Sequence, residues 1–105
     1  MKKNDLNRIK QFIRVSFEIE EALQVSTVQK KILLTIVQLW DQNKKAPPIN
    51  LITQSVKDVS ERSIYRHIKP LFQKGWIQIE DNPNDHRIKL IQPSEALLHF
   101  LSLTI

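Results

Sequence analysis

Residues 4–24 carry apolar side chains at helical spacing on two separate faces. One stripe is formed by Leu6, Ile9, Ile13 and Phe17, and an offset stripe is formed by Phe12, Val15, Ile19 and Leu23. A helix that covers a single core needs only one apolar face. Two stripes therefore predict that this helix packs against its own domain and also against a second surface.

A second helix is predicted from Ser26 to about Asn43. Ser26 and Gln29 have the spacing of a capping box, in which each side chain bonds the backbone amide of the other residue. The inward positions are expected to be Val28, Ile32, Leu33, Ile36, Leu39 and Trp40. Pro47 and Pro48 cannot continue the helical hydrogen-bond ladder, so the helix must end before them.

Two shorter helices follow, separated by a tight turn. Asn50 is placed to cap a helix over residues 51–57, and Ser60 is placed to cap the next helix, over about 61–74. The inward face of the longer helix is expected to be Ile64, Ile68, Leu71 and Phe72. Pro70 lies inside this helix and removes one backbone donor, which predicts a slight bend.

A charged hairpin follows the second of these helices. Gly75, the only glycine of the sequence, stands just past Lys74, where a left-handed residue is needed to end a helix. Residues 76–79 and 87–91 alternate between apolar and polar side chains, as two strands would, and residues 81–85 have turn chemistry. A last helix is predicted to start after Ser94.

This order of elements predicts a winged helix-turn-helix. The fold class is α+β, mainly α with a small β-hairpin wing, in a single domain over residues 1–105. Residues 26–92 form the winged-helix core in this interpretation. A chain of 105 residues has the length of one domain.

The outward face of the helix over 61–74 carries a row of basic and polar side chains. Arg62, Arg66, Lys69 and Gln73 are four, three and four residues apart, and Ser63 and Tyr65 flank the row. Arginine can bind guanine O6 and N7 bidentately, and a recognition helix presents such residues to base edges in the major groove. Ser60 and Ser63 stand at the helix N-terminus, where a phosphate is favoured, and Lys69 also suits a phosphate. The row predicts a site for double-stranded DNA, and the simple alternative is a solvated charged face.

The charge balance supports an anionic partner for this helix and not for the wing. The chain has a net charge of +5 and a pI near 9.7. Residues 60–74 hold four Lys or Arg against one Glu, a net charge of +3, whereas residues 75–105 hold two cations against four carboxylates, a net charge of −2.

Composition excludes several other classes of protein. The absence of cysteine excludes disulfides and thiolate zinc sites, and the three histidines are too scattered for a metal site. One glycine excludes glycine-rich phosphate loops, and no Ser/His/Asp set lies on suitable elements, so we expect neither an enzyme nor a cofactor. No apolar run could span a bilayer and no secretory pattern opens the chain, which predicts a cytoplasmic protein.

Three segments of the chain resemble the MarR family of bacterial regulators. They are Val59–Ile68, the helix end Leu71–Ile77, and Asn84–Ser94, whose Asp-x-Arg wing followed by a serine is the most discriminating part. The resemblance implies a homodimeric transcription factor, often a repressor, on a pseudo-palindromic site. It also implies that Arg87 enters the minor groove and that Asp85 helps to hold the wing. The net acidic wing departs from the family pattern.

Apolar residues at both ends of the chain predict a dimer interface over residues 4–24 and 94–105, because exposed apolar patches usually mark interfaces. The residues expected there are Leu6, Ile9, Phe12, Ile13, Phe17, Leu98 and Leu101. A two-fold dimer would present its recognition helices about 34 Å apart, one turn of DNA. The alternative is that both segments close the core of a monomer. The sequence leaves a small-molecule effector open.

Three functions remain compatible with these patterns. The first is a sequence-specific transcription regulator. The second is a DNA-binding module for plasmid or phage replication or partition. The third is a winged helix that binds an acidic protein through its basic row.

Overall fold

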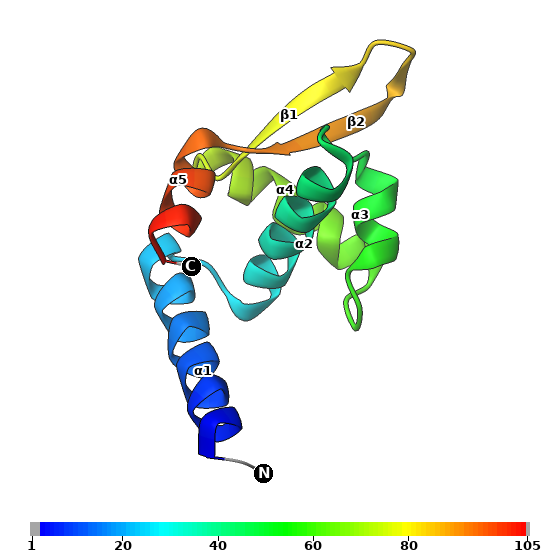
Figure 1. Ribbon diagram of the computed structural model, residues 1–105. Coiled ribbons are helices and arrows are strands. Elements are labelled where there is room, and N and C mark those ends of the chain that lie inside the picture. Colours follow the sequence, from blue (N-terminus) through cyan, green and yellow to red (C-terminus); the bar gives the residue numbers. More distant parts are fainter. Residues whose placement is uncertain (1–2, 105) are drawn as a thin grey trace.

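Five helices and one two-stranded antiparallel sheet follow one another in the computed structural model, which describes residues 3–104 and the side chains of residues 5–102 (Figure 1). The elements are α1 Lys3–Leu23, α2 Thr27–Asn43, α3 Ile49–Ser55, α4 Glu61–Gln73, β1 Ile77–Asn82, β2 Asp85–Pro93 and α5 Glu95–Thr104. This is the winged helix-turn-helix predicted from the sequence: α3 and α4 form the helix-turn-helix, and β1 and β2 form the wing.

Serine side chains start three of the helices. The capping box of α2 is present, since Ser26 Oγ accepts from the Gln29 amide at 3.1 Å and Gln29 Oε1 accepts from the Ser26 amide at 3.1 Å. Ser60 Oγ accepts from the Ser63 amide at 3.1 Å at the start of α4. Ser94 caps α5 in the same way, through the Leu97 amide. Each bond satisfies an amide that a helix N-terminus leaves without a partner.

The end of α4 also agrees with its sequence. Pro70 lies within the helix, and Lys74 caps it. Gly75 follows with φ +83°, the left-handed conformation that glycine adopts without steric cost. The Gly75 amide donates to the Phe72 carbonyl, so the last turn is closed.

Two expectations for the helix-turn-helix were wrong. Asn50 does not cap α3, because the helix begins one residue earlier, at Ile49, and extended Pro48 is its N-cap. The amides of Leu51 and Ile52 donate to the Pro48 carbonyl, so Asn50 already belongs to the first turn. Phe72 is exposed and does not face the core, because its neighbour Leu71 takes the fully buried position.

The wing is longer and its turn tighter than the sequence indicated. Instead of a turn over residues 81–85, β1 continues to Asn82 and β2 begins at Asp85, so only Pro83 and Asn84 connect the strands. A register shift between Asp81 and Asn82 accommodates the short connection. In addition, the Ile91 amide donates to the Pro47 carbonyl at 2.9 Å, which ties the segment before α3 to β2.

One hydrophobic core holds the helices and the base of the wing together. Its least exposed members are Leu23, Ile32, Leu33, Ile36, Ile52, Ile64, Leu71, Ile77, Ile91 and Leu97. Every helix and both strands contribute at least one of them. Burial of an aliphatic side chain of this size contributes about 1.5–3 kcal/mol, so this cluster fixes how α4 is presented.

The C-terminal helix belongs to that core. Leu97 and Leu101 are buried with 0% and 8% of their surface exposed. The chain's own core therefore covers most of Leu101, whose place at a dimer interface stays a prediction. Leu98 is half-buried, and His99 is exposed.

Only the C-terminal part of α1 packs on the domain. Ile19 and Leu23 are buried, Val15 is half-buried, and the helix N-terminal to these residues extends away from the body (Figure 1). Two donors from the junction of α4 and β1 hold the end of α1: Trp76 Nε1 donates to the Leu23 carbonyl at 3.0 Å, and Lys74 Nζ donates to the Gln24 carbonyl.

Candidate nucleic-acid interface

The inward face of α4 decides which side chains it presents to solvent. Ile64, Ile68 and Leu71 are buried at 0%, 6% and 0% exposure. Because side chains three and four positions apart share one helix face, burying these residues turns the opposite face outward. The Ser60 cap fixes where the helix starts.

The predicted basic row lies on that outward face. Arg62, Tyr65, Arg66, Lys69 and Gln73 are exposed, and Ser63 is half-buried. Within residues 5–102, none of their side chains has a hydrogen-bond or ion-pair partner. The arginines and the lysine thus carry charge that no carboxylate of the described chain neutralises. The sequence predicted this placement because the three- and four-residue spacing is the period of the helix.

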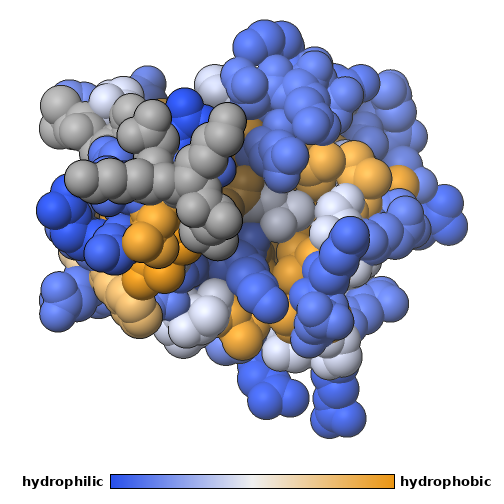
Figure 2. All heavy atoms as spheres, turned by 60° about the horizontal axis from the view of Figure 1, so that its bottom comes forward, coloured by the Kyte–Doolittle hydropathy of each residue, from blue (hydrophilic) through white to orange (hydrophobic). Residues whose placement is uncertain are grey.

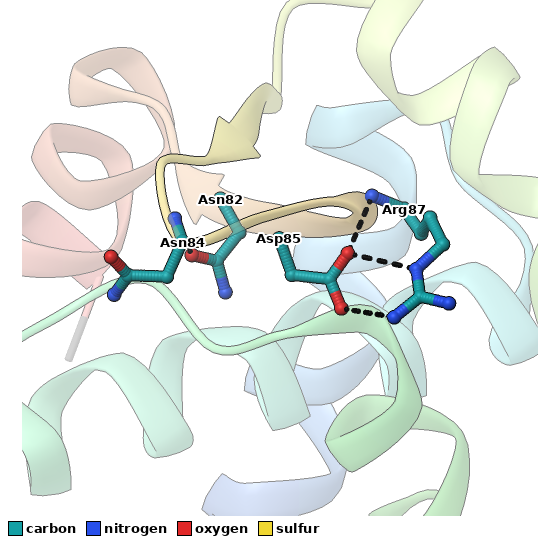
Figure 3. Close-up of polar contacts among 4 residues, drawn as sticks. All are labelled: Asn82, Asn84, Asp85 and Arg87. Carbon is teal, nitrogen blue, oxygen red and sulfur yellow. Dashed lines mark hydrogen bonds and ion pairs between the residues drawn. The ribbon is translucent and has the colours of Figure 1, made fainter.

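The wing has a different electrostatic character, because its cations are paired. Arg87 Nε lies 3.0 Å from Asp85 Oδ1, and Arg87 Nη2 lies 3.1 Å from Oδ2, a bidentate ion pair seen in Figure 3. Asp85 Oδ1 also accepts from the Arg87 amide at 3.1 Å. The guanidinium lowers the pKa of Asp85, and the carboxylate raises the pKa of Arg87. The Arg87 side chain is nevertheless 90% exposed, so the pair orients it without burying it.

Further bonds stiffen the tip of the wing. Asn82 Oδ1 accepts from the Asn84 amide at 2.9 Å, which closes the turn. Across the strands, Lys89 Nζ bonds Asp81, and this bond lowers the pKa of the Asp81 carboxyl. These pairs reduce the field of the acidic side chains that the sequence places in the wing.

One side-chain contact between α2 and α4 was not predicted from the sequence. The Nε2 of Gln29 contacts His67 Nδ1 at 3.3 Å, while its Oε1 accepts from Ser26. Gln29 therefore joins the N-terminus of α2 to the middle of α4. His67 is half-buried, and 38 residues separate the partners, so no local spacing could reveal the contact.

The family model of the LexA DNA binding domain matches residues 22–84, more than half of the chain. The chain belongs to this family. The LexA DNA binding domain match begins at the end of α1, includes the whole helix-turn-helix and ends in the turn of the wing. No curated protein sequence matches the chain.

Solved structures with the same fold include MarR regulators. Reduced AbfR bound to DNA has a TM-score of 0.67 at 20% identity, over 96% of this chain and 71% of AbfR. An S. aureus MepR mutant bound to an oligodeoxyribonucleotide has a TM-score of 0.72 at 14% identity, over 99% and 74%. A mutant MarR from E. coli complexed with operator DNA has a TM-score of 0.65 at 22% identity, over 96% and 66%. At such identities the likeness is one of fold, and at that level it confirms the resemblance to MarR regulators.

Two negative findings apply to the described residues alone. No helix there is both long and apolar enough to cross a membrane. No group of three or more His, Cys, Asp or Glu side chains among them is placed to hold a metal ion.

Proposed function

We propose that this protein is a sequence-specific double-stranded DNA-binding transcription regulator that inserts α4 into the major groove. The observation that carries the proposal is the row of exposed, unpaired cations on the outward face of the helix-turn-helix's second helix. Unneutralised cations release counterions from DNA when they bind phosphates, and this release dominates the affinity. Membership of the LexA DNA binding domain family and the DNA-bound neighbours support the same conclusion.

The position of each side chain along α4 suggests its role. Arg62 and Arg66 stand in the first half of the helix, where a recognition helix meets base edges, and each suits a guanine. Tyr65 offers an exposed ring beside them, suited to an apolar contact with a base. Lys69 lies farther along the row and suits a phosphate, as does the exposed Ser60 at the helix start.

The rest of the proposed site consists of two polar side chains of α4 and one arginine of the wing. Ser63 lies beside Ser60, and Gln73 ends the row as a donor to the DNA backbone. We propose that Arg87 approaches the minor groove and that Asp85 orients it. The bidentate pair supports this assignment, because it holds the exposed guanidinium in one direction at the wing tip.

In this proposal, the protein regulates transcription by occupying its operator. A homodimer bound to a pseudo-palindromic operator would repress transcription by excluding polymerase. Binding of this kind needs no cofactor, since the charges and donors of the row suffice.

A selection from a pool of random duplexes tests the proposal. The wild-type protein should enrich one motif, and the Arg62→Ala/Arg66→Ala variant should lose the enrichment. Lys31→Ala/Lys45→Ala removes the same charge from exposed positions outside α1, α4 and the wing and serves as the matched control, which should enrich the wild-type motif. A wild-type protein that enriches no motif would contradict sequence-specific binding.

A further inference from the structure

Two side-chain contacts tie one flank of α4 to the connection between α1 and α2 and to the first turn of α2. Gln29 Nε2 contacts His67 Nδ1, and Lys74 Nζ donates to the Gln24 carbonyl. His67 and Lys74 are seven positions apart, so they lie on the same flank of the helix, about two turns from each other. This flank of α4 is therefore attached to the α1–α2 region near the middle of the helix and again at its C-terminal end.

The two contacts stand on either side of Pro70, the proline inside α4. A proline removes one backbone donor from a helix, and here the missing donor is the one for the Arg66 carbonyl. The first half of α4, which carries the arginines of the basic row, is thus less firmly joined to the second half than in an unbroken helix. His67 belongs to the first half, whereas Lys74 caps the second. The contact of His67 with Gln29 therefore helps to set the direction of the half proposed to read bases.

The capping box of α2 decides which atom of Gln29 faces His67. Gln29 Oε1 accepts from the Ser26 amide at 3.1 Å, so the Gln29 amide nitrogen, Nε2, is the atom left to point toward α4. This nitrogen is a donor and lies 3.3 Å from His67 Nδ1. It needs an unprotonated ring nitrogen opposite, which only the neutral imidazole offers. The contact therefore requires a neutral His67 ring.

A proton on His67 Nδ1 cannot be accommodated without the loss of a bond. Both nitrogens of a protonated imidazole are donors, so Nδ1 would face the donor of Gln29. Rotation of the Gln29 amide by half a turn would offer its oxygen to the ring, but its nitrogen would then face the Ser26 amide. Protonation therefore either separates His67 from α2 or removes one bond of the α2 cap. Histidine side chains ordinarily change charge between pH 5 and 8.

The charged groups of the elements that pack against α4 offer no replacement for the lost contact. On α4 itself, the positions three and four residues from His67 are uncharged: Ser63, Ile64, Pro70 and Leu71. The neighbouring helix α3 has no titratable side chain, and the nearest cation on α2, Lys30, is ion-paired with Glu20. The carboxylates of β1 are exposed Glu80 and Asp81, which is ion-paired within the wing. Within residues 5–102, no carboxylate forms an ion pair with His67.

Solvent reaches this end of the molecule. The connection between α1 and α2 lies below α2 in Figure 1, and Ser26 at its end is exposed. Figure 2 brings that end forward and shows hydrophilic side chains over most of the surface, with apolar patches between them. Gln29 and His67 are themselves only half-buried. Their contact can therefore exchange protons with solvent in the folded protein.

We propose that Gln29 and His67 are positioning residues for α4, which hold its first half in the orientation for specific DNA binding only while the His67 ring is neutral. Specific binding then weakens as pH falls. The added charge acts in the opposite direction, because a cation on α4 raises the affinity for every duplex alike. The effect on DNA rests on the proposed function, whereas the coupling of His67 to the α2 cap does not.

Nuclear magnetic resonance of the whole chain without DNA tests this coupling. Between pH 8 and pH 5 the ring protons of His67 report its protonation, and the Ser26 amide reports the capping bond. The Ser26 resonance should move with the same midpoint as the His67 ring, and it should stay in place in His67→Asn. Asparagine offers an oxygen acceptor near the place of Nδ1, does not titrate in this range, and has a helix propensity close to that of histidine. A Ser26 resonance that does not follow the His67 ring would overturn the proposal.

Fluorescence anisotropy at pH 7.5 and pH 5.5, at one ionic strength, tests the effect on DNA binding. The measured quantity is the ratio of the affinities for the selected duplex and for a scrambled duplex of the same composition, because added charge changes both affinities together. In the wild type this ratio should fall about three- to tenfold at the lower pH, the effect of losing one hydrogen bond. In His67→Asn the ratio should be equal at the two pH values. His99→Asn is the matched control, since His99 is exposed on α5, and it should show the wild-type fall.

Gln29→Glu provides a second variant in which the contact tolerates the proton. A carboxylate at position 29 still accepts from the Ser26 amide and so keeps the capping box. Its second oxygen can accept from protonated His67, so the affinity ratio should no longer fall between pH 7.5 and pH 5.5. This variant keeps the test decisive if His67→Asn does not fold.

A wild-type ratio that is independent of pH overturns the proposal, and so does a fall that persists in His67→Asn or Gln29→Glu. A protein that distinguishes no duplexes at pH 7.5 fails the proposed function instead. In that case the Ser26 resonance still decides whether His67 controls the α2 cap.

Discussion

Individual residues of α4 have separable roles in the proposed complex, since Arg66 stands over base edges and Lys69 over a phosphate. Arg66→Ala should weaken specific binding by about 1–3 kcal/mol and relax the preference at one base position. Lys69→Ala should weaken binding to all duplexes alike and lower the salt slope by about 1. Anisotropy titrations against single-base variants of the selected duplex measure both effects. An unchanged affinity for Arg66→Ala would instead favour an acidic protein as the partner.

The Glu20 carboxylate should contribute to the stability of the fold in a pH-dependent way. Hydrogen bonds from Thr27 and Lys30 lower the pKa of Glu20, and its carboxylate lies 3.1 Å from Lys30 Nζ. A lowered folded-state pKa means that the stabilisation is present above the unfolded-state pKa and is lost as pH falls through the folded-state pKa. Glu20→Gln should therefore lower the free energy of unfolding at pH 7 and reduce its fall toward pH 3.

Urea unfolding at both pH values measures that difference. Glu21→Gln is the matched control, because Glu21 is exposed and makes no ion pair with any described residue. Equal pH dependence in Glu20→Gln and the wild type would show that the Glu20–Lys30 contact does not stabilise the joint between α1 and α2.

The residues of the basic row could be predicted because a helix repeats every 3.6 residues, so burial of Ile64 and Ile68 fixes where Arg62 and Arg66 point. The same rule failed at Phe72, since adjacent Leu71 already fills the core and the period alone does not rank two neighbours. The contact of Gln29 with His67 joins distant segments and depends on the final packing of α2 on α4.

At the scale of elements, the junction between α4 and the wing depends on one backbone conformation. Gly75 has φ +83°, and a Cβ placed on it would have open space around it. Gly75→Ala should therefore cost about 1–2 kcal/mol, the penalty of a left-handed conformation for an L side chain, without any clash. Gly75→Asn should cost less, because asparagine tolerates this conformation.

Urea denaturation midpoints measure the effect of these substitutions, with the slope m expected to stay constant. If alanine and asparagine cost the same, the side chain's surroundings and not the backbone conformation would set the penalty.

The elements themselves followed from the sequence where a local signal marks their ends. Ser26, Ser60, Ser94 and Gly75 each mark a boundary through a bond or a conformation of their own. The predicted wing turn was longer than the observed one, because Asp81 and Asp85 are typical turn residues and were assigned to the turn. In the structure each forms a cross-strand or local ion pair instead, with Lys89 and Arg87.

At the scale of the whole molecule, the two ends of the chain differ in a way that hydrophobic patterning did not reveal. Both α1 and α5 are more apolar than a surface helix needs, and both were expected at an interface. Residues 5–17 project from the domain, whereas Leu97 and Leu101 of α5 complete its core. Which apolar segment closes a core depends on the space that the other elements leave, and that is a property of the assembled fold.

The salt dependence of DNA binding tests whether this protein is a sequence-specific DNA-binding regulator. Fluorescence anisotropy would compare the selected duplex with a scrambled duplex of the same composition over a series of salt concentrations. We predict tight binding to the selected duplex and weaker binding to the scrambled one. The logarithm of each affinity should fall steeply and linearly with the logarithm of the salt concentration. Equal affinity for both duplexes, or no binding even at low salt, would contradict a sequence-specific DNA-binding regulator.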